Sequence, residues 1–302
     1  MIPRIAIACG DPAGIGPEIS LKAALDPRVR AICRPVLVGD RAVFALYGKT
    51  SEVEILEIKH PKPKIGEIDP AHGRAAIAAA EAAIRGALAG EFDAVVGAPH
   101  TEAAIHAAGI EFDGYPSFVA RLAGLPPEDG ILMLCFEHQG REVRIAHVTL
   151  HVAVAQALKL ITRERILKTI RAVNAALKNP RIAVSGVNPH AGEAGAFGRE
   201  EIEIVAPALE QARREGMAVD GPIGADTLIQ RAGYDAYVVM LHDQGHVAAK
   251  LLAPQRVAGL TIGTPVLFSS VAHGSALDIA GKGRVDHGAM LQALERMARL
   301  CR

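Results

Sequence analysis

Polar side chains that suit acid–base or metal chemistry follow several short hydrophobic runs in this chain. His, Asp or Asn comes directly after five of these runs, at Asp11, His100, His151, Asn188 to His190, and His242 to His246. If the runs are parallel strands, their carboxyl ends share one edge of a sheet, where loops converge and helix N-termini direct free N–H groups at a ligand. The sequence therefore predicts one shared site for these side chains.

Three of the histidines, His151, His190 and His242, form a candidate metal site. Neutral imidazole is the commonest metal-binding side chain, and three histidines with an open fourth position are typical of a catalytic site. A histidine at a strand end can equally cap a helix or bond a backbone carbonyl, and these separations carry no motif value. Asp226 and Asp243 nearby favour the metal site, with zinc as the expected ion and magnesium, manganese or cobalt as alternatives.

A divalent ion beside a hydroxyl and a carboxylate lowers the pKa of the alcohol and then polarises the ketone, so that a β-carboxylate can leave. Such chemistry also needs a general base. Lys250 lies eight residues after His242, two helical turns further along, and burial would lower its pKa enough for proton transfer. The alternative is a solvated surface lysine, the usual situation for this residue type.

Two glycine-rich stretches each link a predicted strand to a predicted helix and are candidates for anion binding. Residues 10–18 have glycines at 10, 14 and 16, which does not match the G-x-G-x-x-G spacing of a dinucleotide-binding loop. Asp40, at the end of the next predicted strand, is therefore not expected to bind a ribose. Residues 190–198 permit close approach of the backbone to a dinucleotide, and the alternative is an ordinary flexible loop. No acid or arginine that reads the ribose is identified, so NAD and NADP both stay open.

Short β-branched runs alternate with Ala-rich stretches along the chain, which is typical of parallel α/β sheets flanked by helices. We expect strands at 4–9, 35–39, 94–97, 131–135, 144–149, 181–186, 236–241 and 260–262. Helices are expected at 73–89, 162–177 and 199–215, where apolar residues recur at spacings of three and four. Turn signals at 126–130 and near Pro254 divide the chain into one lobe of 1–125 with 255–302 and a second lobe of 126–254 that carries the dimer contacts.

The composition limits the classes of function. With 50% hydrophobic and 22% charged residues over 302 positions, the chain is long enough for two cores and is neither disordered nor collagen-like. Lys plus Arg and Asp plus Glu both number 33, so no overall positive field attracts nucleic acid or a membrane, which favours a small-molecule substrate. Four scattered cysteines indicate a reducing, cytoplasmic location, and the first residues match neither a signal peptide nor a membrane span.

Five ordered motifs cover almost the whole chain, namely GDPAGIGPE (10–18), VNPHAGEAGAFG (187–198), GPIGADT (221–227), MLHDQGHVAAK (240–250) and VAHGSALDIAGKG (271–283). Together they resemble the 4-hydroxythreonine-4-phosphate dehydrogenase family. The resemblance implies an isocitrate/isopropylmalate-dehydrogenase-like fold with two α/β/α lobes and a cleft between them. It also implies a homodimer whose partner subunit completes the site, and an NAD-dependent oxidation coupled to decarboxylation.

The same resemblance assigns roles to residues. The metal ligands would be His151, His190 and His242, and the catalytic side chains would be Lys250, Asp226 and Asp243. Apart from the resemblance, the second glycine-rich stretch supplies the expected cofactor residues Asn188, Gly192, Glu193 and Gly195.

The substrate-binding part departs from the family. Where the family carries a Gly-His-Thr-Glu segment that holds the substrate and its phosphate, this chain has Gly-Tyr-Pro-Ser at 114–117, and Glu102 replaces a lysine. An Asn and an Arg that contact phosphate in the family align with Gly259 and Phe268. A phosphate dianion without these donors is poorly held, so a phosphorylated substrate is not expected.

Residues 99–100, 105–106, 114–117, 147–151 and 242–246 instead resemble a branch of the family that acts in terephthalate degradation. This branch oxidises 1,2-dihydroxy-3,5-cyclohexadiene-1,4-dicarboxylate to protocatechuate and carbon dioxide. We expect the substrate to contact Asp11, His100, Tyr115, Ser117 and Phe268. Lys250, Arg256 and Arg284 are candidates for the distal carboxylate, and none of them is assigned.

Three alternatives stay open. The first keeps the family and takes a phosphorylated hydroxy acid such as 4-phosphothreonate or 4-hydroxythreonine 4-phosphate. The second is a metal-dependent hydrolase whose histidines activate water. A non-catalytic binding protein is disfavoured, because so many titratable groups follow predicted strands.

Overall fold

A computed structural model describes residues 2–254, 256–271 and 273–301. The chain forms two compact units, unit 1 with residues 1–125 and 264–302, and unit 2 with residues 126–263. The second break differs from the one expected near Pro254. The strand β10 (Ala258–Ile262) belongs to unit 2, because it pairs along its length with β5 (Ile131–His138).

Unit 1 is built on five parallel strands in the order β3-β2-β1-β4-β11. Their bounds are β1 Arg4–Ala8, β2 Arg34–Gly39, β3 Glu54–Glu57, β4 Ala94–Gly97 and β11 Phe268–Val271. In β1, Ile7 pairs with Leu37 on one side and with Val96 on the other. The central strands are hydrophobic along nearly their whole length because helices cover both faces of the sheet.

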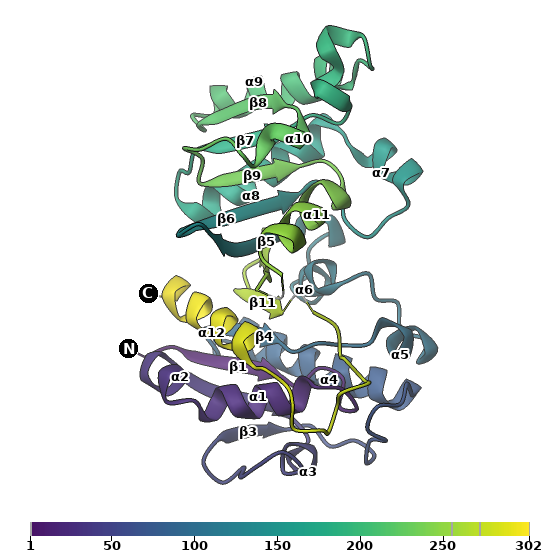
Figure 1. The fold of residues 1–302 in the computed structure, drawn as a ribbon, viewed down its shortest axis with the longest axis vertical. Coiled ribbons are helices and arrows are strands. Elements are labelled where there is room, and N and C mark those ends of the chain that lie inside the picture. The colour runs from purple at the N-terminus through teal and green to yellow at the C-terminus, as the bar shows by residue number, and fades with distance from the viewer. Residues whose placement is uncertain (1, 255, 272, 302) are drawn as a thin grey trace. The chain divides into compact units, whose positions relative to one another are not determined.

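Two sets of helices cover the sheet of unit 1 (Figure 1). One set is α1 Gly16–Leu25, α2 Pro27–Ile32, α3 Arg41–Phe44 and α12 Gly288–Leu300. The other set is α4 Pro70–Leu88, α5 Glu102–Ala107 and α6 Tyr115–Leu122. α4 contains most of the helix expected at 73–89 and starts earlier, because the Asp69 carboxylate accepts a hydrogen bond from Ala71 N at 2.7 Å and Pro70 suits the first helical position.

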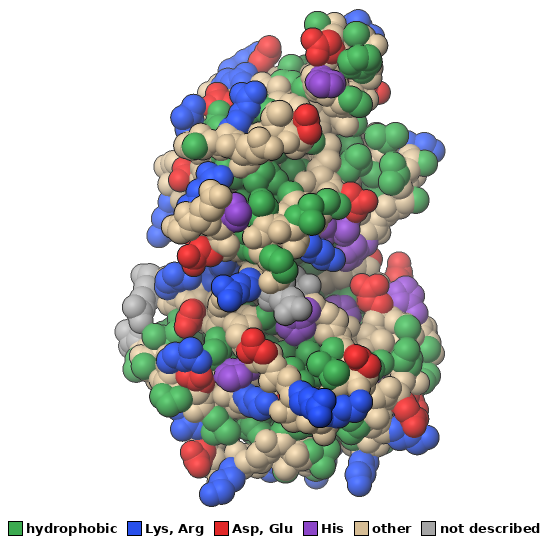
Figure 2. All heavy atoms as spheres, viewed as in Figure 1, with side chains coloured by type: hydrophobic (Ala, Val, Ile, Leu, Met, Phe, Trp, Pro, Cys, Tyr) green, Lys and Arg blue, Asp and Glu red, His purple; other side chains and the backbone are tan. Residues whose placement is uncertain are grey.

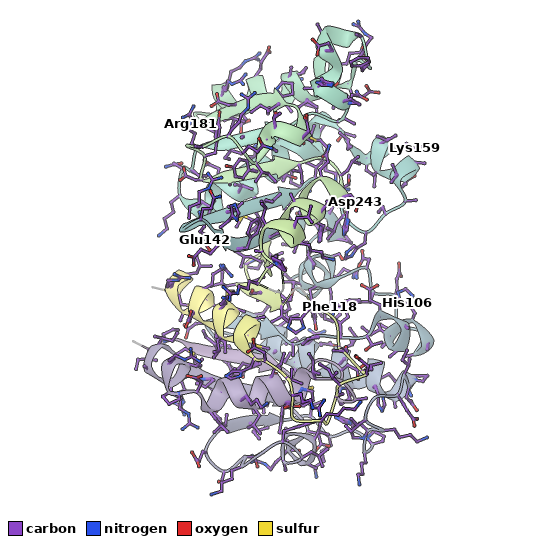
Figure 3. All side chains as sticks on the ribbon, viewed as in Figure 1. His106, Phe118, Glu142, Lys159, Arg181 and Asp243 are labelled. Carbon is purple, nitrogen blue, oxygen red and sulfur yellow. The ribbon has the colours of Figure 1, made fainter. Side chains whose placement is uncertain are left out.

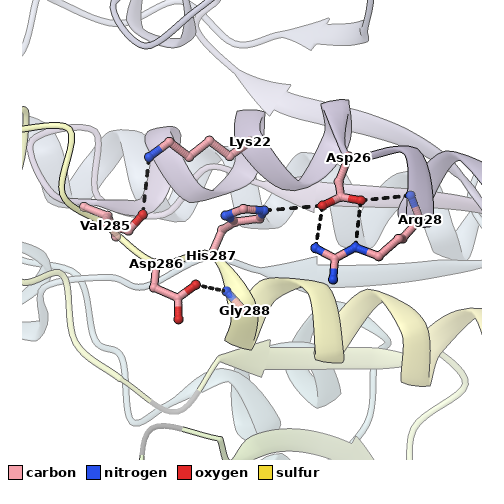
Figure 4. Close-up of polar contacts among 7 residues, drawn as sticks. All are labelled: Lys22, Asp26, Arg28, Val285, Asp286, His287 and Gly288. Carbon is pink, nitrogen blue, oxygen red and sulfur yellow. Dashed lines mark hydrogen bonds and ion pairs between the residues drawn. The ribbon is translucent and has the colours of Figure 1, made fainter.

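Hydrogen bonds and an ion pair hold residues 285–287, the segment before α12, against α1 and the start of α2 (Figure 4). Lys22 Nζ donates to the Val285 carbonyl at 3.3 Å, and His287 Nε2 lies 3.5 Å from Asp26 Oδ2. Asp26 also caps α2 and accepts from the Arg28 guanidinium at 2.7 and 3.0 Å. These hydrogen bonds from Arg28 hold the pKa of Asp26 well below its usual range, so this link uses a charged carboxylate.

Unit 2 contains a mixed sheet in the order β10-β5-β6-β9-β7-β8. The bounds of the strands not yet given are β6 Arg141–His147, β7 Ile182–Ser185, β8 Val219–Ile223 and β9 Ala236–Val239. The strands β6, β9 and β7 are parallel, as the sequence predicts, and β8, which the sequence did not predict, pairs parallel with β7. The expected parallel arrangement is wrong for β5, which pairs antiparallel with both of its neighbours, β10 and β6.

A tight turn explains the antiparallel pair of β5 and β6. Gln139 and Gly140 both have positive φ angles, 50° and 74°, which is the backbone form of a two-residue hairpin turn. Strands expected at 131–135 and 144–149 are therefore two arms of one hairpin, each longer toward the turn.

Helices lie on both faces of the sheet in unit 2. Their bounds are α7 Val154–Leu160, α8 Arg163–Leu177, α9 Ala206–Arg214, α10 Ala225–Leu228 and α11 His242–Leu252. Shorter turns are η1 Pro127–Asp129, η2 Pro189–Gly195 and the π-helical η3 Glu201–Val205. α8 and α9 pack on one face, and α11 packs on the other over a core that includes Phe136, Ile145 and Tyr237. No helix within the described ranges has the length and apolarity to cross a membrane.

Candidate active site

Four histidines gather where β6 and β9 end and α11 begins. The rings of His242 and His246 stack with centroids 3.7 Å apart, and the His147 ring lies 4.8 Å from His246. The ring of His151, in the loop after β6, lies 5.6 Å from that of His242. Because β6 and β9 are parallel neighbours, their carboxyl ends bring these side chains together. Two of the three expected metal ligands, His151 and His242, are thus close neighbours.

The other two histidines of this group, His147 and His246, have no role predicted from the sequence. The signal for His246 was available, since residues four apart on a helix share one face and His242 opens α11. Burial lowers the pKa of His147 to about 3, and the nearby His246 contributes to this shift. Burial also lowers the pKa of His246 to about 4, with further contributions from His242 and Lys250. Both rings are therefore neutral near neutral pH.

The helix α11 approaches β6 closely because residue 245 is glycine. A Cβ on Gly245 would lie 2.3 Å from His147 Nε2 and 3.0 Å from Ile145 Cγ2. The His147 side chain is 3% exposed, and its Nδ1 lies 3.3 Å from the Leu132 carbonyl oxygen. Gly245 therefore sets how deeply the first turn of α11, which carries His242, lies against the sheet.

Gln244 fixes the start of α11 against two strands. Its Oε1 accepts hydrogen bonds from Met240 N at 2.9 Å and from Leu241 N at 3.0 Å, just after β9. Its Nε2 donates to the Gly186 carbonyl at 3.1 Å, just after β7. One side chain therefore joins the carboxyl ends of β7 and β9, the strands that precede His190 and His242.

A cavity of about 470 Å³ opens beside His151 and His242 and is lined by residues 149–154, 157 and 241–243. Figure 3 shows Asp243 where α11 begins, on the side of α7. Asp243 Oδ1 lies 2.7 Å from His242 Nδ1. Since a carboxylate only accepts, Nδ1 must donate, and in the neutral ring Nε2 then keeps the lone pair that a metal ligand needs.

The rings of His151 and His242 are spaced as two ligands of one metal ion would be. Two imidazoles bound to one zinc ion at about 2.0–2.1 Å place their ring centres roughly 5 Å apart, close to the spacing seen here. Across residues 2–254, 256–271 and 273–301, however, no three His, Cys, Asp or Glu side chains lie close enough together to hold an ion. One chain thus offers two of the three expected ligands.

The third expected ligand, His190, belongs to a different group. It lies in η2, and its Cα is 3.6 Å from the position that a Cβ on Gly224 would take. Asp226 Oδ1 lies 2.7 Å from the same point, at the start of α10. Asp226 and His190 are therefore neighbours around Gly224, and the three-histidine site expected from the sequence is not assembled within one chain.

The expected cofactor residues Asn188, Gly192, Glu193 and Gly195 lie in and around η2, which has an unusual backbone. Residues 190–194 all have positive φ angles, between 42° and 79°. Only one of these five residues is glycine, and the left-handed conformation costs an L-residue roughly 1–2 kcal/mol. Such a loop persists only where surrounding contacts hold it.

Lys250 and Asp243 are both exposed on α11. The positive charge of Lys250 contributes to the lowered pKa of His246, so the two side chains are near each other. The burial that the sequence analysis required of a catalytic Lys250 is not present in the single chain. Lys250 therefore acts on the histidine group through its positive charge, which lowers the pKa of His246.

In unit 1, Asp11 follows β1 and is 1% exposed. Its N–H donates to the Pro99 carbonyl at 2.8 Å, and its Oδ1 accepts from Ala13 N at 2.9 Å. Glycine is needed at residue 10 for this turn, because φ is 67° and an added Cβ would lie only 2.1 Å from Pro99 O. Oδ2 of Asp11 has no hydrogen-bond partner within the part of the chain that the structure describes. Asp11 therefore keeps an unsatisfied acceptor beside the loop that carries His100.

Aromatic rings surround His100. Its ring lies 4.9 Å from Phe112 and 4.8 Å from Tyr115, both nearly perpendicular to it. Tyr115 in turn lies 4.7 Å from Phe268. Phe268 is fully buried and Tyr115 is 5% exposed, and burial raises the pKa of the Tyr115 hydroxyl. Phe268 therefore supports Tyr115 from the core rather than lining an open surface.

The fifth expected substrate residue, Ser117, is engaged by a carboxylate that the sequence analysis did not consider. Ser117 Oγ donates to Asp113 Oδ1 at 2.5 Å, and Arg121 Nη2 donates to the same oxygen at 2.6 Å. Burial alone would raise the pKa of Asp113, but these hydrogen bonds from Arg121 and Ser117 lower it. The Asp113 carboxylate thus accepts hydrogen bonds from two polar side chains of α6, Ser117 and Arg121.

The minor candidates have simpler roles. Asp40 Oδ1 accepts a hydrogen bond from Ala42 N at 2.7 Å and caps α3. This capping role accounts for an aspartate after β2 without any contact to a ribose. Arg256 and Arg284 are exposed, in unit 2 and unit 1 respectively.

The fold of the chain is also found in a solved structure of low sequence identity. A solved isocitrate dehydrogenase from Methylococcus capsulatus shares the fold, with a TM-score of 0.55 at 16% identity over 98% of this chain and 85% of that chain. The expected isocitrate/isopropylmalate-dehydrogenase-like α/β fold is thus confirmed.

The particular family follows from sequence. The family described as pyridoxal phosphate biosynthetic protein PdxA matches residues 21–297, and the chain belongs to this family. A Comamonas protein named 1,2-dihydroxy-3,5-cyclohexadiene-1,4-dicarboxylate dehydrogenase is 41% identical over 96% of each chain. A solved 4-hydroxythreonine-4-phosphate dehydrogenase from Klebsiella pneumoniae has a TM-score of 0.84 at 31% identity, covering 100% of this chain and 98% of its own.

A solved terephthalate 1,2-cis-dihydrodiol dehydrogenase from Burkholderia xenovorans has a TM-score of 0.70 at 40% identity, covering 98% of this chain and 97% of its own. The family resemblance stated from the motifs is confirmed. The chain is a dehydrogenase of the PdxA family.

Proposed function

We propose that this dehydrogenase uses NAD and a divalent metal ion to oxidise 1,2-dihydroxy-3,5-cyclohexadiene-1,4-dicarboxylate and to release carbon dioxide. The C–H bond of the oxidised carbinol breaks, its hydride passes to NAD, and the hydroxyl proton is released. The C–C bond to the adjacent carboxylate then breaks and carbon dioxide leaves. The electron pair of that bond forms the new C=C bond of the aromatic ring, and the former ketone oxygen takes up a proton to give protocatechuate. Similarity to the Comamonas enzyme of that name supports this choice of substrate.

The observation that carries the choice of substrate is the carboxylate of Asp113. It already binds Ser117, in the first turn of α6, and Arg121, in the last turn of the same helix. A phosphate group there would meet a negative charge and occupied donors, which disfavours a phosphorylated substrate. The adjacent rings of His100, Phe112 and Tyr115 are suited to a flat hydrocarbon ring.

The metal ion would be held by Nε2 of His242 and by His151, with His190 of a partner subunit as the third ligand. When bound, it would polarise the hydroxyl oxygen of the substrate and then the oxygen of the ketone. Asp243 would orient His242 through the Nδ1 hydrogen bond. Lys250 and Asp226 are the proposed proton-transfer groups, and both are exposed on the single chain.

A homodimer follows from the incomplete metal site. Apolar side chains lie exposed next to His151, with Val152, Val154 and Leu158 at 42%, 66% and 51% exposure. Figure 2 shows hydrophobic side chains gathered on this face near α7. Burying this surface against a second copy is favourable. The four cysteines are widely scattered in the sequence, in keeping with the proposed cytoplasmic location.

The test mixes purified protein with the dihydrodiol dicarboxylate, NAD and a divalent ion, and follows NADH absorbance and carbon dioxide release. We expect both products in equal amounts, with zinc, magnesium, manganese and cobalt compared in parallel and NADP compared with NAD. Absence of NADH with all four ions would overturn the proposal. Formation of NADH without carbon dioxide would retain the dehydrogenase and overturn the decarboxylation.

A second candidate substrate is a phosphorylated hydroxy acid such as 4-phosphothreonate, because the Klebsiella 4-hydroxythreonine-4-phosphate dehydrogenase has the same fold along the whole chain. Inorganic phosphate separates the two candidates. Strong competitive inhibition by phosphate would favour this second substrate, whereas no inhibition supports the dihydrodiol.

A further inference from the structure

The side chain of Glu201 lies inside the loop that carries the proposed cofactor residues. It is 3% exposed, although the loop around it reaches the surface. Its Oε1 accepts hydrogen bonds from Val187 N and Asn188 N, both at 2.7 Å. Its Oε2 accepts from Asn188 Nδ2 at 2.9 Å. One buried carboxylate therefore binds three N–H groups at the start of the loop.

Two glycines make room for this carboxylate. A Cβ on Gly192 would lie 2.5 Å from Glu201 Oε2, and a Cβ on Gly186 would lie 3.0 Å from Glu201 Oε1. Gly192 is in the middle of the left-handed run and has a φ of 79°. The loop is thus wrapped around the carboxylate from its first residue to its middle.

The backbone that carries Glu201 is itself anchored. Glu201 begins the π-helical turn η3, and Val205 at the other end of this turn is fully buried. π-helical turns are uncommon and are found frequently at functional sites. The neighbouring acids differ, since Glu203 is exposed and accepts a hydrogen bond from Arg199 Nε at 2.6 Å.

We infer that Glu201 is a positioning residue that holds the loop of residues 187–198 in its binding conformation. The inference rests on the proposed function, in which this loop binds NAD and presents His190. A strained left-handed run persists only when contacts around it determine its shape, and Glu201 supplies the buried contacts at its base. Glu201 does not touch the substrate or the reacting atoms in this role.

The test compares Glu201→Ala, Glu201→Gln and the matched control Glu203→Ala in the full-length protein. We expect Glu201→Ala to raise the KM for NAD by about tenfold or more while kcat changes by less than about threefold, in line with the effect of losing a supporting contact. Glutamine keeps an oxygen that can accept from both backbone N–H groups, so Glu201→Gln should recover most of the loss. Glu203→Ala should match the wild type.

A purely structural Glu201 gives a different result. It would lower the melting temperature and the fraction of active protein without changing the KM for NAD, and this outcome would overturn the inference. If Glu201→Ala does not fold, Glu201→Asp carries the same test, because its shorter side chain withdraws the carboxylate from the two backbone N–H groups.

Hydrogen exchange separates failure of the inference from failure of the proposed function. We expect faster amide exchange within residues 187–198 in Glu201→Ala than in Glu203→Ala, with or without NAD activity. If the wild type does not use NAD but this exchange difference appears, the proposed function fails and the role of Glu201 in holding the loop stands. Equal exchange in the two variants would overturn the inference.

Discussion

Substituting Gly245 by alanine tests how the site is assembled. The new Cβ would lie 2.3 Å from His147 Nε2, whereas ordinary contacts begin at 3.4 Å, so the helix and the ring must separate by about 1.1 Å. His147 is 3% exposed and packs against β5 and α11, so it has little freedom to move away. The first turn of α11 must then shift, and it carries His242.

Two opposing effects determine how much Gly245→Ala changes the free energy of unfolding. Forcing an extra carbon into a packed core costs about 1–3 kcal/mol, and alanine in place of glycine in a helix returns up to about 1 kcal/mol. We expect a net loss of about 1 kcal/mol, or a melting temperature lower by about 2–4 °C. A displacement of about 1 Å at a catalytic group costs roughly 100-fold in rate, so kcat should fall far more than stability.

The assay combines thermal unfolding with NADH formation for Gly245→Ala and for Val247→Ala, an exposed position on the same helix. The reasoning is refuted if Gly245→Ala keeps wild-type kcat. A second check introduces Gly245→Ala into His147→Ala, where the ring is absent. The stability cost of the alanine should then largely disappear, and an equal cost in both backgrounds would show that the ring is not the obstacle.

Three further predictions concern the metal ligand, the substrate site and the pH dependence of stability. His242→Ala should lower kcat and metal affinity by roughly 10–100-fold or more, measured by NADH formation and by metal analysis, and full activity would exclude it as a ligand. Asp113→Asn should release Arg121 and make inorganic phosphate a stronger inhibitor than in the wild type, and unchanged inhibition would remove the argument against phosphate. Hydrogen bonds from Arg171 lower the pKa of Glu215 to about 2, so its contribution to stability is complete above the unfolded pKa of about 4.3 and is lost as pH falls toward 2. In urea unfolding between these pH values, the free energy of unfolding of Glu215→Gln should depend less on pH than that of the wild type. Identical pH dependence of the two proteins would contradict a stabilising role of the charged Glu215.

The regular elements were predictable where local signals agree with the fold. β4 occupies residues 94–97 as expected, and α8 ends at Leu177 as expected after a cap on Thr162. Three strands were not predicted, because β3 is a short edge strand with exposed residues, β8 contains Asp-Gly-Pro, and β11 contains two serines. Neighbouring strands hold these segments extended where their own composition does not.

The sequence alone determined which chemistry is present, because histidines and carboxylates directly after hydrophobic runs must lie at strand ends in any parallel arrangement of those runs. It did not determine which of these side chains meet. His151 and His242 meet because β6 and β9 are adjacent and because Gly245 lets α11 approach the sheet. His190 follows β7, which is also adjacent to β9, yet a left-handed loop wrapped around Glu201 carries it toward α10 instead. Strand order and a buried carboxylate, both set by contacts between distant residues, therefore decided the composition of the site.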